Sequence, residues 1–139
     1  MKLSQLILFV SILALSGCAA SSEKVAEESQ EKAATVCVSV RNISSFDAID
    51  DQYLYVKALG KQRHFLFTMD RACFGLRSAQ TIAVRDKFTR VCSDSFGEVI
   101  YRDIGRGLES CRIRDIEAAA SKADVEKLAE DRKAKKRDE

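Results

Sequence analysis

Four of the five cysteines of this 139-residue chain, Cys37, Cys73, Cys92 and Cys111, constrain its fold more than any other feature, and the fifth, Cys18, belongs to an N-terminal signal. An even number of cysteines in a small exported domain is typical of a disulfide framework. No two of them stand as C-x-x-C and the chain has a single histidine, so their spacing disfavours both a zinc site and a thiol oxidoreductase. We therefore predict two structural disulfides, for which three connectivities exist.

The first 17 residues have the organisation of a secretory signal. Lys2 precedes the apolar run 6–14, and the small residues of Leu15-Ser16-Gly17 lead into Cys18. The apolar run is shorter than the roughly 20 residues that a membrane-spanning helix needs. The stretch 15–18 resembles the lipobox of bacterial lipoproteins, in which the cysteine is lipid-modified and becomes the mature N-terminus.

The lipobox pattern predicts lipidation of Cys18 and a membrane anchor made by the lipid. A plain secretory signal is the alternative, and it would leave Cys18 as a free thiol in an oxidising compartment. One acyl chain binds a membrane only marginally, whereas the three chains of lipoproteins that this signal resembles give a stable anchor. Ala19, rather than Asp, follows Cys18. By the same resemblance, this favours the outer membrane, facing the periplasm.

The mature chain has room for one modest domain and carries little net charge. Of the 23 basic residues only Lys2 lies in the signal, and 21 acidic residues balance the rest. This balance gives no support for nucleic-acid binding. We divide the chain into a signal peptide (1–17), a lipidated cysteine with a polar tether (18–35), a β-domain (36–117) and a charged tail (118–139).

The β-domain is predicted from short alternating segments separated by turn residues. These segments cover residues 36–40, 43–49, 53–59, 65–69, 81–84 with an extension toward 91, 98–101 and 111–116. In 53–59, Leu54, Val56 and Ala58 would face one side of the sheet and Tyr53 and Tyr55 the other. The pattern predicts a mostly β fold, a small antiparallel barrel or sandwich of about five to six strands.

Closure of such a barrel would bring its first and last strands together. On that basis we expect the pairs Cys37–Cys111 and Cys73–Cys92. They would close loops of about 75 and about 20 residues, and on the loop-entropy account each would contribute about 3 to 4.5 kcal/mol.

The C-terminal segment 118–139 is rich in Ala, Glu and Lys and has high helix propensity. Val125, Leu128 and Ala129 provide only a thin apolar stripe, so a solvated, fraying helix or a disordered tail is expected. The alternative is a helix that binds a partner or a membrane surface through its basic cluster, which comprises Lys133, Lys135, Lys136 and Arg137.

No motif in the chain predicts a catalytic, metal or cofactor site. His64 has no G-x-S-x-G nucleophile motif to serve and is expected at a hairpin surface. No phosphate-binding glycine motif and no calcium loop occurs in the sequence. Tyr53, Tyr55 and Phe65 are expected to pack in the domain rather than to form an exposed aromatic patch. The carboxylates are expected to bond their own turns, and they are Asp47, Asp50, Asp51, Asp94 and Asp103.

Residues 36–117 resemble a family of short proteobacterial lipoproteins of unknown function. The resemblance lies in Cys37-x-x-x-Arg41-x-Ile43-x-x-Phe46, Asp50-Asp51, Cys73-Phe74-Gly75-Leu76, Arg90-Val91-Cys92-Ser93 and Cys111-Arg112-Ile113. The family typically has a Gly-Asp pair soon after the third cysteine, where this chain has Asp94-Ser95. The resemblance implies an architecture and a location but no reaction.

Together, these observations predict a non-enzymatic cell-envelope lipoprotein that acts as an accessory or binding module. Its expected partners are the membrane, through Cys18, and an envelope protein. The alternative is a small periplasmic hydrolase or redox enzyme, which free thiols of low pKa would indicate.

Overall fold

The computed structural model describes residues 34–138, which form eight strands, two 3-10 turns and one α-helix. The strands are β1 (Cys37–Ser39), β2 (Ile43–Ala48), β3 (Tyr53–Ala58), β4 (His64–Met69), β5 (Ile82–Arg85), β6 (Arg90–Cys92), β7 (Glu98–Asp103) and β8 (Gly107–Ala119). The turns are η1 (Val40–Asn42) and η2 (Leu76–Ser78), and α1 is Lys122–Arg137. The predicted mostly β, antiparallel class with a C-terminal helix is confirmed. The described part has more strands than expected, in part because the stretch 81–91 divides into β5 and β6.

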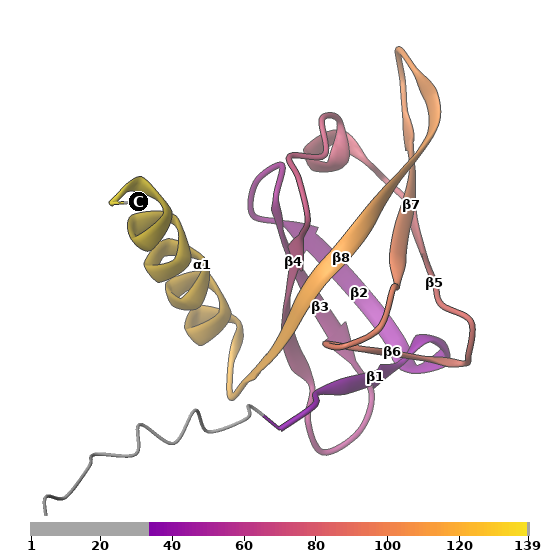
Figure 1. Ribbon diagram of the computed structural model, residues 1–139. Helices are drawn as coiled ribbons and strands as arrows, with labels where there is room; N and C mark the ends of the chain where they lie inside the picture. Colours follow the sequence, from indigo (N-terminus) through magenta and orange to yellow (C-terminus); the bar gives the residue numbers. More distant parts are fainter. Residues whose placement is uncertain (1–33, 139) are drawn as a thin grey trace, which may run out of the picture. The chain divides into compact units, whose positions relative to one another are not determined.

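The strands form two antiparallel sheets. Six of them follow the order β2-β3-β4-β8-β7-β5 in a sheet that curls into a half-barrel, and β1 and β6 form a separate two-stranded ribbon at one end of it (Figure 1). The β3–β4 hairpin spans the turn predicted at residues 60–63, where Gly60 has a φ of 127° that suits glycine. The long last strand β8 is central in the sheet, paired with β4 on one side and β7 on the other.

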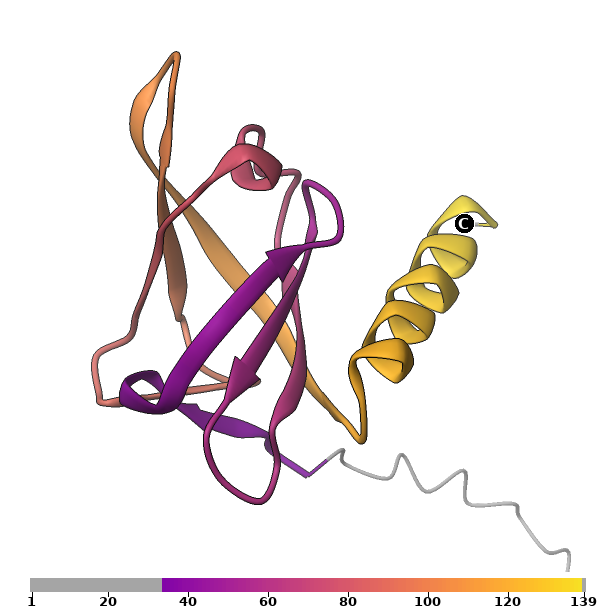
Figure 2. The ribbon, with the colours of Figure 1, turned by 180° about the vertical axis from the view of Figure 1, so that it is seen from behind.

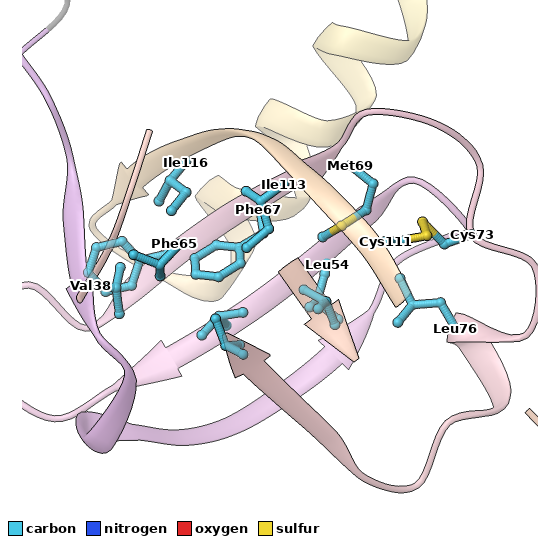
Figure 3. Packing of buried hydrophobic residues seen from close by; sticks show 14 of the residues in the cluster. Val38, Leu54, Phe65, Phe67, Met69, Cys73, Leu76, Cys111, Ile113 and Ile116 are labelled. Carbon is cyan, nitrogen blue, oxygen red and sulfur yellow. A yellow bond between two sulfur atoms is a disulfide. The ribbon is translucent and has the colours of Figure 1, made fainter. Parts of the chain in front are cut away.

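The concave side of the half-barrel holds the main hydrophobic core (Figure 3). In β3, Leu54, Val56 and Ala58 belong to this core, while Tyr53 and Tyr55 lie on the opposite face in a second cluster. The predicted alternation of β3 is therefore confirmed. Other large side chains of the main core are Val38, Phe65, Phe67, Met69, Leu76, Ile113 and Ile116.

The expected disulfide pairing is wrong. The structure pairs Cys37 with Cys92 and Cys73 with Cys111. The first strand does not meet the last one: β1 pairs with β6 in the separate ribbon, where Cys37 stands directly opposite Cys92. Cys111 lies in the middle of β8, beside the loop after β4 that carries Cys73. The expected pairing required β1 to close the main sheet, and β1 does not belong to that sheet.

The C-terminal segment is also more ordered than expected, since α1 packs on the outer face of the half-barrel (Figures 1 and 2). Val125 and Ala129 have no exposed surface and form the second cluster together with Tyr53, Tyr55 and Leu66. The predicted helix is thus confirmed and most of its surface is exposed, but the expectation of a fraying or disordered segment is wrong, because Val125 and Ala129 are buried against the sheet.

Candidate functional site

Ion pairs at the surface join α1 to the rest of the domain. At the start of the helix, Lys122 Nζ lies 2.7 Å from Asp47 Oδ2, at the end of β2. Near its end, Lys133 Nζ lies 2.9 Å from Asp50 Oδ2, in the loop before β3. Ser121 caps the helix, because its Oγ accepts a hydrogen bond from a backbone N–H in the first turn. Together with the buried contacts of Val125 and Ala129, these surface pairs place the last turns of α1 beside the sheet.

A β-bulge in β8 lies opposite the last turns of α1. Thr68 of β4 pairs with Asp115, whereas the next residue, Met69, pairs with Ile113, so Arg114 is an extra residue in β8. A bulge bends its strand and redirects a side chain, and bulges are over-represented next to functional sites. Here the bulge places Arg114 on the rim of a pocket under the end of α1.

This pocket has a volume of about 290 Å³ and four basic side chains in its lining. The lining comes from β3, β4, β8 and α1 and consists of Tyr53, Thr68, Arg114, Asp115, Arg132, Lys135 and Lys136. We call it the basic pocket. Its one carboxylate, Asp115, accepts a hydrogen bond from the backbone N–H of Ile116 at 2.8 Å.

The four cations of the basic pocket differ in their partners. Arg132 makes a bidentate ion pair with Glu117, with N–O distances of 2.6 and 3.2 Å, and this pairing raises the pKa of its guanidinium. Lys136 donates to the Oε1 atom of Gln52 at 3.0 Å. Arg114 and Lys135 have no ion pair within residues 34–138. Lys136 also has no ion pair there, so three of the four charges are not neutralised, and Arg114 and Lys135 in addition make no side-chain hydrogen bond within the described residues.

Two hydroxyls add neutral donors. Tyr53 and Thr68 are only 4% exposed and stand opposite each other on β3 and β4. Neither hydroxyl has a hydrogen-bond partner within residues 34–138. Every fully enclosed side-chain polar atom in this part of the chain does have a partner. The two hydroxyl oxygens are therefore not fully enclosed, and they face the open volume of the pocket. Burial, and then the nearby Asp50, raise the pKa of Tyr53, so the phenol remains protonated at neutral pH.

A wider hollow adjoins the basic pocket and shares Tyr53 and Lys136 with it. Its volume is about 550 Å³, and charges of both signs line it, among them Asp50, Asp51 and Lys133. Lys133 pairs with Asp50 and with Glu130, and the hydrogen bonds to these carboxylates raise its pKa. This mixture of charges gives the hollow no preference for either sign.

The residues singled out in the sequence have structural roles where they are described. Asp50 Oδ1 accepts from the backbone N–H groups of Gln52 and Tyr53, and Asp103 binds its own turn in the same way, as expected for turn carboxylates. The same expectation is wrong for Asp47, which pairs with Lys122, and for Asp94, which accepts from the Thr35 hydroxyl. His64 Nδ1 lies 2.9 Å from the Tyr55 hydroxyl. Tyr53, Tyr55 and Phe65 are buried, which confirms the packing interpretation of these aromatic residues.

Other predicted features are only partly described. The four cysteines of the domain are all in disulfides, and Cys18 with the predicted signal peptide lies outside the described residues. Within residues 34–138, no group of three or more metal-ligating side chains occurs. The same part of the chain contains no helix long and apolar enough to cross a membrane.

The sequence pointed to Lys135 and Lys136 only as part of a basic cluster and to Tyr53 only as a packing residue, and it did not predict the basic pocket. One signal for it was present in the sequence. Core residues of β8 are two apart at Cys111 and Ile113 and then three apart at Ile116, and a strand accommodates this change of spacing with a bulge. The position of α1 against the bulge had no such signal.

Fold and site together define a small disulfide-bonded antiparallel β-domain with a docked helix and a cationic pocket between them. The profile of a family of unknown function, DUF6491, matches residues 1–139. The chain belongs to this family. No curated protein and no solved structure matches the chain in the comparisons made.

Proposed function

We propose that this protein is a lipid-anchored protein of the bacterial cell envelope that works as a non-enzymatic binding module. The observation that carries the proposal is the pair of disulfides in a chain that begins with a lipobox-like signal. Disulfides persist in oxidising compartments such as the periplasm. The anchor is the lipid on Cys18, and Ala19 favours the outer membrane, with the domain facing the periplasm.

The proposal of a binding module rests on the chemistry of the basic pocket. Its charged groups are two arginines, two lysines and a carboxylate, and its neutral groups are two protonated hydroxyls. Fixed cations and hydroxyl donors hold a ligand by charge and hydrogen bonds without taking part in a covalent step. The bonded state of the four domain cysteines speaks against the redox alternative.

Fractionation of cells tests the anchor. We expect the wild-type chain in the outer-membrane fraction and the Cys18→Ala variant outside the membrane fractions, because the variant has no residue to carry the lipid. Ala19→Asp is the matched variant, since it keeps Cys18 and should move the protein to the inner membrane. Retention of Cys18→Ala in the membrane at the wild-type level would overturn the proposal.

A further inference from the structure

The basic pocket carries an inference about its ligand, which rests on the proposed role as a binding module. The residues around it come from four elements that are distant in sequence, so they do not form a simple charged run along one helix. The dipole of α1 favours cations in its last turn and accounts for Lys135 and Lys136. It does not account for Arg114, which reaches the pocket from the bulge in β8.

The charge of the basic pocket favours a dianion. Four cations and Asp115 leave a net charge of +3 in the lining, and Glu117, which pairs with Arg132, lowers it to +2. A phosphate monoester carries about −1.5 to −2 charges at neutral pH, whereas a single carboxylate carries −1. A phosphate group therefore matches the pocket better than a carboxylate does.

The geometry supports the same choice. The guanidinium of Arg114 is a planar fork that can bind two phosphate oxygens, and Lys135 supplies a point charge from the opposite wall. Tyr53 and Thr68 are the most buried residues of the lining, and their hydroxyls can donate to ligand oxygens that the cations do not reach. At about 290 Å³ the pocket has the size of a small group rather than of a large ligand.

We propose that the basic pocket binds a phosphate monoester group, with Arg114 and Lys135 as its main charged contacts and with Tyr53 and Thr68 as hydrogen-bond donors. A free small phosphate ester and the headgroup of a phosphorylated lipid present the same chemistry to these side chains. The adjoining hollow leaves room for the rest of either molecule.

Calorimetry on the mature full chain in detergent tests this proposal, with inorganic phosphate as the titrant and chloride used to hold the ionic strength constant. We expect saturable binding that Arg114→Ala weakens at least tenfold and Arg114→Lys weakens less, because lysine keeps the charge and loses the fork. Lys135→Ala should also weaken binding. Arg102→Ala is the matched control, since Arg102 is an exposed arginine on β7 outside the pocket, and it should leave the affinity unchanged within twofold.

Three further titrants define the chemistry and the source of the ligand. Acetate should bind at least tenfold more weakly than phosphate. Glycerol phosphate and short-chain phosphatidic acid carry the same monoester, so tighter binding of the phosphatidic acid identifies a lipid headgroup, and equal binding identifies a soluble ester. Circular dichroism verifies that each variant is folded.

Three results would overturn the proposal: no binding of phosphate at constant ionic strength, equal weakening by the Arg114 and Arg102 variants, or equal affinity for acetate. Each is independent of the anchor, which is tested by fractionation. If the chain is anchored but does not bind phosphate, the proposal of a phosphate ligand is refuted and the proposal of a lipid anchor is not.

Discussion

Removal of each disulfide in turn should destabilise the domain by a large and predictable amount. The bridges join cysteines 55 and 38 residues apart. On the loop-entropy account these separations correspond to about 4.2 kcal/mol for Cys37–Cys92 and about 3.9 kcal/mol for Cys73–Cys111. Either value is a large fraction of the 5 to 15 kcal/mol that stabilises a typical domain, which makes both double-alanine variants strongly destabilised.

Burial separates the two bridges where loop length does not. Cys73 and Cys111 are 1% and 3% exposed, whereas Cys37 and Cys92 are half-buried. Replacing the two buried cysteines by alanine leaves a cavity, which lowers the free energy of unfolding by a further amount of about 1 to 2 kcal/mol. We therefore expect Cys73→Ala/Cys111→Ala to have the lower free energy of unfolding in urea, although its loop is the shorter one.

Thiol counts in the same variants test the pairing directly. In a Cys18→Ala background, Cys37→Ala/Cys92→Ala should have no free thiol, because the other bridge remains. Cys37→Ala/Cys111→Ala should have two, because it breaks both bridges. The reverse pattern of counts would refute the pairing, and equal unfolding free energies for the two native-pair variants would refute the burial argument.

Three further changes have defined outcomes. Val125→Ala should lower the free energy of unfolding by about 2 kcal/mol in urea titrations, since this side chain of α1 is fully buried against the sheet; a loss below about 0.5 kcal/mol would mean that the helix is not docked. Gly75→Ala should destabilise the domain in thermal unfolding, because φ is 90° and a Cβ would overlap the Asp103 carboxylate; an unchanged midpoint would contradict this. Burial raises the pKa of Tyr53 and of Tyr101 in the folded state, so the stability that both contribute is complete below about pH 10 and is lost as pH rises through the folded pKa. Tyr53→Phe should reduce this loss of stability at alkaline pH, measured by denaturation at pH 8 to 11.5. A stability profile identical to that of the wild type would show that Tyr53 does not cause the loss.

Local patterns of the sequence were sufficient to predict most strands and their faces. The alternation of Leu54, Val56 and Ala58 identified the buried side of β3 because a strand turns its side chains with a period of two. The turn roles of Asp50 and Asp103 followed in the same way from local backbone chemistry.

Features that depend on the arrangement of strands could not be predicted in this way. The pairing of Cys37 with Cys92 depends on β1 leaving the main sheet for β6, which no local pattern indicates. The basic pocket depends on the docking of α1, whose stripe of Val125 and Ala129 looked too thin for burial. Docking is set by the tyrosine face of β3 and by ion pairs between distant residues, and spacing along one segment shows neither.

Lipidation of Cys18 is the central claim of the proposed function, and mass spectrometry of the N-terminal peptide tests it most directly. For protein extracted from bacterial membranes, we predict a peptide that begins at Cys18 and carries the mass of the attached acyl chains. A peptide that still begins at Met1, or one that begins at Cys18 with a free thiol and no lipid, would contradict the account.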